Sequence, residues 1–124
     1  MTTKILIADD EPNILISLEF LMKREGYEVL LARDGQEALD LLRRERPRLV
    51  LLDVMMPRKT GFEVCQEVRN DDDLRATLIL MLTAKGRETD VVKGLALGAN
   101  AYMTKPFSTR ELVQKVREML EAAA

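Results

Sequence analysis

Residues 5–12 read Ile-Leu-Ile-Ala-Asp-Asp-Glu-Pro, four apolar residues followed at once by three acids and a proline. A short apolar run that ends in this way is typical of a strand in a parallel sheet covered on both faces. The residues that follow carry apolar side chains at helical spacing, namely Ile14, Leu15, Leu18, Leu21 and Met22. This spacing predicts an amphipathic helix. The stretch therefore predicts a strand, a polar edge and a helix in that order.

The same alternation recurs along the rest of the chain. The predicted strands are Ile5 to Ala8, Val29 to Ala32, Leu49 to Leu52, Leu78 to Leu82 and Ala101 to Met103, each too continuously apolar for a half-exposed strand. Strands that alternate with helices predict an α/β fold, a doubly wound five-stranded parallel sheet flanked by five helices. We take the strand order to be 2-1-3-4-5, one of the two common orders of such sheets. The third and fourth strands are expected to be the most central. All 124 residues are expected to form one domain.

Helix boundaries are marked by capping residues. Thr60 with Glu63, and Ser108 with Glu111, have the spacing of a capping box before an amphipathic run. Gly26 and a later glycine, Gly98, fit the ends of helices. These signals support the helix positions that the hydrophobic pattern predicts.

Composition excludes several classes of function. The chain has 19 Lys and Arg against 21 Asp and Glu, so no overall positive field favours nucleic acid, and no direct nucleic-acid binding by this segment is expected. A single cysteine cannot form an internal disulfide, and no apolar run is long enough for a membrane span. There is no histidine, the commonest general base and zinc ligand. The composition favours a soluble, cytoplasmic protein with no membrane partner.

Polar side chains stand at the ends of the predicted strands. Asp9 and Asp10 follow the first strand, Asp53 the third and Thr83 the fourth, and Lys105 comes shortly after the fifth. In a sheet of this order, ligands bind beyond the carboxyl ends of the strands, between strands one and three. We therefore expect the three aspartates to converge there, although each residue taken alone could equally be a helix cap or a surface side chain.

Three carboxylates about 5 Å apart repel one another by roughly 3 kcal/mol per pair at an effective dielectric constant of 20. Such a cluster needs a cation, and ligands that are all oxygen favour Mg²⁺. Lys105 is then placed to pair with a phosphate, and Thr83 to donate a hydrogen bond to it.

The residues that suggest this site also carry a family resemblance. The relevant stretches are residues 5–12, Leu-Leu-Asp-Val-Met-Met-Pro at 51–57, Leu-Thr-Ala at 82–84, and Gly-Leu-Ala-Leu-Gly-Ala-Asn-Ala-Tyr-Met-Thr-Lys-Pro-Phe at 94–107. With them, essentially the whole chain resembles the receiver domain of bacterial two-component response regulators. The resemblance implies the flavodoxin-like receiver fold and a phosphoacceptor function in signalling.

The resemblance also implies the metal ligands. Asp53 would be the phosphoacceptor, and Asp10 and Asp53 would ligate Mg²⁺ together with the backbone carbonyl of Met55. Asp9 would act through metal-bound water.

The remaining roles concern the phosphoryl group. Lys105 would hold one phosphoryl oxygen, and Thr83 would hydrogen-bond another with help from the backbone N–H of Ala84. Tyr102 would be the aromatic side chain that responds to phosphorylation, with plain packing as the alternative.

Partners follow from the same resemblance. Asp53 would take the phosphoryl group from a sensor histidine kinase or a phosphotransfer protein, so the chain would be an autocatalytic phosphoacceptor and not a turnover enzyme on external substrates. A downstream protein or output domain would read the face formed by helix four, strand five and helix five. The end of the sequence at Ala124 fits either a stand-alone receiver or a fragment cut at a domain boundary.

The sequence departs from the family pattern at three places. Residues 58–60, Arg-Lys-Thr, make the loop after Pro57 more basic than usual, which bears on partner preference. Met55 and Lys85 flank the expected route of the hydrolytic water, which predicts a long-lived phosphoryl form. Val91, Asn100 and Ala101 replace charged residues that pair across the dimer of the winged-helix branch; a weak or phosphorylation-dependent dimer is left open.

Three other functions are less consistent with the sequence. A phosphatase of the haloacid-dehalogenase type needs a second acid two residues after Asp53, where this chain has Met55. An FMN carrier of flavodoxin type needs a neutral phosphate-binding loop, whereas Asp9, Asp10 and Glu11 would repel phosphate. A degenerate receiver that acts only as an interaction module is disfavoured because every expected site position is present.

Overall fold

The structure, a computed structural model, describes residues 2–84 and 86–123. Within these residues five strands alternate with five helices, as predicted. The elements are β1 (Lys4–Ala8), α1 (Pro12–Arg24), β2 (Glu28–Ala32), α2 (Gly35–Glu45), β3 (Leu49–Asp53), α3 (Gly61–Asn70), β4 (Leu78–Ala84), α4 (Glu88–Leu97), β5 (Ala101–Lys105) and α5 (Thr109–Ala122).

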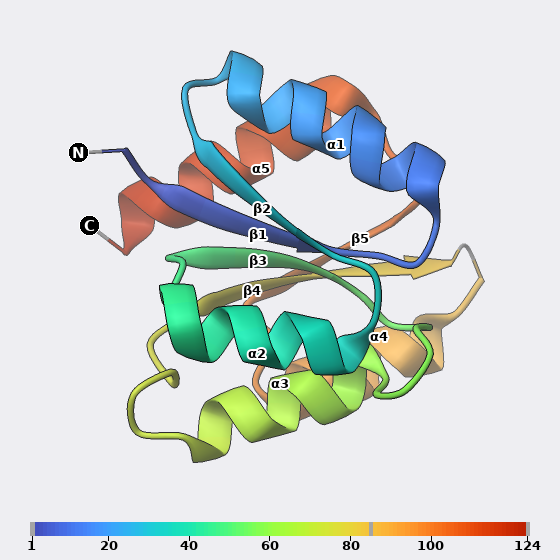
Figure 1. The fold of residues 1–124 in the computed structure, drawn as a ribbon. Coiled ribbons are helices and arrows are strands. Elements are labelled where there is room, and N and C mark those ends of the chain that lie inside the picture. The colour runs from blue at the N-terminus through green and yellow to red at the C-terminus, as the bar shows by residue number, and fades with distance from the viewer. Residues whose placement is uncertain (1, 85, 124) are drawn as a thin grey trace.

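The strands form one parallel sheet in the order β2-β1-β3-β4-β5, which confirms the predicted topology. Ile7 of β1, for example, lies opposite Leu31 of β2 on one side and Leu51 of β3 on the other. Figure 1 shows α1 and α5 on one face of the sheet and α2, α3 and α4 on the other. The carboxyl ends of all five strands therefore meet at a single edge of the sheet.

Two hydrophobic clusters, one on each face, hold the layers together. Successive side chains of a buried strand point to opposite faces of the sheet. Ile5 and Ile7 therefore pack with α1 and α5, while Leu6 and Ala8 pack with α2 and α3. Full burial of such a side chain contributes about 1.5–3 kcal/mol. This two-sided burial explains why β1 and β3 read as unbroken apolar runs.

The expectation that every strand is buried on both faces is wrong for the two edge strands. In β5, Tyr102 and Thr104 are exposed and alternate with half-buried residues, and β2 is buried fully only at Ala32. Both strands have only one neighbour in the sheet, so one long side of each strand is left without a covering strand. β5 also extends to Lys105, two residues beyond the predicted end, because its ladder with β4 continues through Thr83 and Ala84.

The predicted helix boundaries are confirmed by capping hydrogen bonds. At Thr60 both bonds of the capping box are present, with Glu63 N donating to Thr60 Oγ1 at 3.2 Å and Thr60 N donating to Glu63 Oε1 at 3.0 Å. At Ser108 the side chain accepts a bond from Glu111 N at 3.3 Å. Gly98 ends α4 with φ of 113°, a left-handed conformation that glycine adopts without strain.

Helix α4 is anchored differently from the other helices. Its buried residues are Asp90 and Gly94, and of its apolar side chains Leu97 packs, partly buried, against the core. Val92 and Leu95 are exposed. The helix therefore fully buries only a glycine and an acid, with Leu97 partly buried, whereas α1 buries four large apolar side chains.

Within residues 2–84 and 86–123, the structure contains no helix with both the length and the apolar character needed to cross a bilayer.

Candidate functional site

The residues singled out at the strand ends lie together at the carboxyl edge of the sheet. Asp9 directly follows β1, Asp53 is the last residue of β3, and Lys105 is the last residue of β5. Thr83 is the penultimate residue of β4. Because the strands are parallel and in register, four neighbouring strands deliver these side chains to one place.

Asp9, Asp10 and Asp53 form the predicted acidic cluster. Each offers one carboxylate oxygen such that the three oxygens lie within 4.8 Å of one another. Asp9 is completely buried, Asp53 is 6% exposed and Asp10 faces solvent. Asp9 is fixed by a hydrogen bond that its Oδ1 accepts from Glu11 N at 2.9 Å. The expected convergence of the three side chains is confirmed.

This cluster fits a hard divalent cation. Its donors are all carboxylate oxygens, two of them buried, and buried carboxylates at this spacing need positive charge to offset their repulsion. Asp10, the exposed member, lies on the open side where an ion with several bound waters can enter. Mg²⁺ prefers oxygen ligands and keeps several waters, so this donor set suits that ion.

Lys105 places a positive charge beside the acidic cluster. Its Nζ donates a hydrogen bond to Asp9 Oδ2 at 2.8 Å and lies 3.4 Å from Asp53 Oδ1 and 3.6 Å from Glu11 Oε1. Burial by itself would lower the pKa of Lys105, but the hydrogen bond to Asp9 and the charges of Asp53 and Asp9 outweigh it and raise that pKa. The ammonium group is therefore firmly charged at neutral pH.

Asp53 has a perturbed pKa. Burial is the largest cause and the negative charge of Asp9 the next, and together they raise the pKa of Asp53 from 3.8 to about 7, against the opposing effect of Lys105. A strongly raised carboxyl pKa in a cleft marks a candidate functional group. A further cation bound near Asp53 would lower this pKa and favour the ionised, nucleophilic form.

Thr83 has a buried hydroxyl group that can donate a hydrogen bond to a ligand. Thr83 is 1% exposed, and among the described residues no group forms a hydrogen bond with its Oγ1. A buried hydroxyl without a partner costs roughly 1–3 kcal/mol. An anion bound beside Asp53 would remove this cost by accepting the hydrogen bond.

The other predicted site residues lie around the mouth of the site or beside it. Ala84 and Met55 line the pocket, and Met55 is 61% exposed. Tyr102 is 45% exposed, lies within β5 and lines a different depression, next to Leu95. Lys85, which the sequence placed at the rim, lies outside the described residues.

A pocket of about 290 Å³ opens above Asp53, and four of its lining residues had no predicted part in holding the metal or the phosphoryl group. They are Glu11, Val54, Arg87 and Asp90, which join Asp53 and Lys105 in the lining. Arg87 pairs with Asp90 through Nε–Oδ2 and Nη2–Oδ1 distances of 3.1 and 3.4 Å. Their three-residue spacing could have suggested the pair, but no pattern indicates that it faces the pocket.

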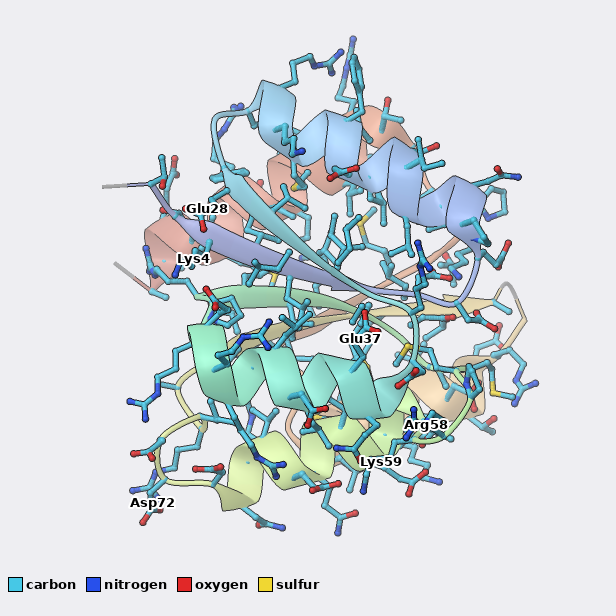
Figure 2. The ribbon with its side chains drawn as sticks, in the orientation of Figure 1. Lys4, Glu28, Glu37, Arg58, Lys59 and Asp72 are labelled. Atoms are coloured by element: carbon cyan, nitrogen blue, oxygen red, sulfur yellow. The ribbon has the colours of Figure 1, made fainter. Side chains whose placement is uncertain are left out.

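The basic loop between β3 and α3 lies against the start of α2. Figure 2 shows Arg58 and Lys59 close to the end of α2 that carries Glu37. The Lys59 side chain is held by Glu67 at 2.8 Å, whereas Arg58 is exposed and lies 4.0 Å from Asp34. The backbone of Lys59 packs so tightly on Gly35 that a Cβ there would overlap the Lys59 carbonyl oxygen. Of the two basic side chains in this loop, that of Arg58 is thus the more accessible.

Together, the doubly wound sheet and the acidic pocket at its carboxyl edge define a domain of receiver type. The model of the response regulator receiver domain matches residues 5–117. The chain belongs to this family.

Solved structures support the assignment. A chain from Chloroflexus aurantiacus assigned to the response regulators is 36% identical, with a TM-score of 0.93 and coverage of 98% of this chain and 99% of that one. The chemotaxis response regulator CheY4 of Vibrio cholerae is 34% identical, with a TM-score of 0.89 and coverage of 95% and 98%. The BeF3-activated receiver domain of DrrB is 31% identical, with a TM-score of 0.88 and coverage of 98% and 99%.

Proposed function

We propose that this chain is a phosphoacceptor signalling domain in which Asp53 receives a phosphoryl group from a sensor histidine kinase or a phosphotransfer protein. One observation carries the proposal. Asp53 is buried at the carboxyl edge of the sheet, within reach of Asp9, Asp10 and Lys105. The neighbouring strand carries the Thr83 hydroxyl, which has no hydrogen-bond partner within residues 2–84 and 86–123. Family membership and the BeF3-activated relative support it.

In the proposed reaction, a carboxylate oxygen of Asp53 attacks phosphorus and forms an acyl phosphate. The bond between phosphorus and the donor's imidazole nitrogen breaks, and the imidazole leaves with the electron pair and later takes a proton. Lys105 neutralises negative charge beside Asp53 while this happens. A Mg²⁺ ion held by Asp10, Asp53 and the Met55 carbonyl, with Asp9 acting through water, would supply further charge neutralisation on the phosphoryl oxygens.

Hydrogen-bond donors at the end of β4 could bind the new phosphoryl group. The Thr83 hydroxyl, which no described residue bonds, would donate a hydrogen bond to it, and the backbone N–H of Ala84 is the next one along β4. The small Ala84 side chain leaves room in the pocket lining. We assign phosphoryl binding to Lys105, Thr83 and the backbone of Ala84.

The proposed output surface is the face formed by α4, β5 and α5. Three apolar side chains on it are exposed, namely Val92 at 68%, Leu95 at 43% and Tyr102 at 45%. Met81 of β4 lies opposite Tyr102 in the ladder, two residues before Thr83. Movement of Thr83 toward a phosphoryl group would therefore be transmitted along β4 to the surroundings of Tyr102.

Receiver domains interact with histidine kinases and with output domains. For this chain we infer a cytoplasmic phosphoacceptor domain over residues 1–124 that does not turn over external substrates or bind nucleic acid directly. Asn100 is one of the residues that replace charged residues of the winged-helix branch. It accepts hydrogen bonds from Ile79 N and Arg69 Nη2 at 2.7 and 2.8 Å, so it has a structural role within its own chain. Any dimer would be weak or would depend on phosphorylation.

The test is incubation with a small acyl phosphate and Mg²⁺, followed by intact-mass measurement. The expected result is one added phosphoryl group, lost slowly, and no addition when Mg²⁺ is chelated. Asp53→Ala should abolish the addition, whereas Asp72→Ala should not, because Asp72 is highly exposed and lies at the other end of the molecule (Figure 2). Addition to the Asp53→Ala variant would refute the assignment.

A further inference from the structure

The Arg87–Asp90 pair lies at the phosphoacceptor pocket, on the side formed by α4. Arg87 directly precedes α4 and Asp90 is in its first turn. The Asp90 side chain is only 11% exposed, whereas that of Arg87 is 52% exposed. Arg87 is therefore a solvent-accessible cation that a nearly buried carboxylate holds at the pocket.

The charges of the pocket show why this pair matters for an added phosphoryl group. Lys105 already lies within 3.6 Å of three carboxylates, those of Asp9, Asp53 and Glu11. A phosphoryl group on Asp53 brings up to two more negative charges into the same space. Among the described residues that line the pocket, Arg87 is the one other basic side chain, and its charge is directed at Asp90.

We propose that Arg87 is a second phosphoryl-binding cation, which exchanges the Asp90 carboxylate for phosphoryl oxygens when Asp53 is modified. This inference rests on the proposed function of Asp53. The guanidinium group presents a planar fork of N–H donors that matches phosphoryl oxygens as well as it matches a carboxylate. Asp90 is then a positioning residue, because it holds Arg87 to one side until the phosphoryl group arrives.

The position of Asp90 makes this exchange feasible. A carboxylate in the first turn of a helix is stabilised by the backbone N–H groups and the helix dipole, so Asp90 keeps favourable interactions after Arg87 leaves. The exchange also removes a contact between α4 and the segment before it. Phosphoryl binding would thereby reach α4 directly, in addition to the route through Thr83.

The test measures the affinity of the whole chain for beryllofluoride, a phosphoryl mimic, in the presence of Mg²⁺. The chain has no tryptophan, so ¹⁹F NMR of the bound ligand is the readout. Arg87→Gln should weaken binding about tenfold, equivalent to ~1.4 kcal/mol, and Arg87→Lys should restore part of it. Asp90→Asn should strengthen binding about threefold, because it releases Arg87, and should have no effect when combined with Arg87→Gln.

The matched control is the pair Asp72 and Arg75, which has the same spacing, a distance of 3.4 Å and no part in the pocket. Arg75→Gln and Asp72→Asn should leave the affinity unchanged. Equal affinities for wild type, Arg87→Gln and Asp90→Asn would overturn the role of Arg87 while leaving Asp53 as phosphoacceptor. Weaker binding by Asp90→Asn would overturn the exchange, and no binding by wild type would overturn both proposals. A urea midpoint for each variant establishes that it is folded.

Discussion

Replacing Asp53 with asparagine is expected to stabilise the protein at pH 8 in the absence of divalent cations. The substitution keeps the shape of the side chain and removes a buried negative charge that Asp9 repels. Lys105 loses one partner but keeps its 2.8 Å hydrogen bond to Asp9. The variant therefore removes more repulsion than attraction.

The magnitude follows from the pKa of Asp53, which is raised from 3.8 to about 7 in the folded protein. Between these pH values the folded protein holds a proton that the unfolded chain has released, so the free energy of unfolding falls as the pH rises through this interval. At about 1.4 kcal/mol per pH unit the whole interval gives at most ~4 kcal/mol. Screening by solvent at the open side of the pocket reduces this to about 2 kcal/mol.

Urea unfolding in a chelating buffer, at intervals from pH 4 to pH 8, measures this difference. Asp53→Asn should exceed wild type by about 2 kcal/mol at pH 8, and the gain should shrink toward zero as the pH approaches 4. Asp72→Asn is the matched control, since its carboxylate is exposed and no gain is expected. A gain that does not change with pH, or no gain at pH 8, would refute the electrostatic reasoning.

Three further predictions concern other parts of the structure. Arg69→Ala removes the 2.8 Å hydrogen bond to the Gly98 carbonyl and others beside it, so urea unfolding should show a loss of about 3 kcal/mol. Gly61→Ala places a Cβ where it overlaps the Asp53 carbonyl oxygen, so the free energy of unfolding should fall by at least about 2 kcal/mol and phosphorylation should slow. Met55→Asn puts a polar side chain at the pocket mouth, so the acyl phosphate should hydrolyse about threefold faster, equivalent to ~0.6 kcal/mol; an unchanged rate would contradict the proposed shielding.

Hydrophobic pattern was sufficient to predict the sheet and its polar edge. Runs such as residues 5–8 are buried on both faces, as expected for the strands of a covered parallel sheet. Parallel strands must end at one edge, so the closeness of Asp9, Asp10 and Asp53 followed from the order of the strands alone. The same logic failed at β5, because Tyr102 is apolar enough to read as buried while its strand lies at the edge of the sheet.

Side-chain geometry within the pocket could not be predicted in this way. Whether Lys105 prefers Asp9 or Asp53 depends on distances that differ by well under an ångström, 2.8 against 3.4 Å. The position of Arg87 could not be predicted because this residue lies between β4 and α4, where the sequence shows neither helical nor strand periodicity. Local spacing indicates which charges can pair, but the tertiary structure decides which of them face the ligand.

The shallow seating of α4 has a consequence for how a receiver of this kind can diversify. Protein cores resist change because displaced side chains leave voids. Helix α4 fully buries only Gly94 and Asp90, with Leu97 partly buried, so a small shift of α4 costs less packing than the same shift of α1 would. Its exposed residues, such as Val92 and Leu95, can be exchanged without disturbing either hydrophobic cluster. New partner proteins can therefore be recognised after substitutions on the exposed side of α4, while the site at the carboxyl edge of the sheet stays unchanged.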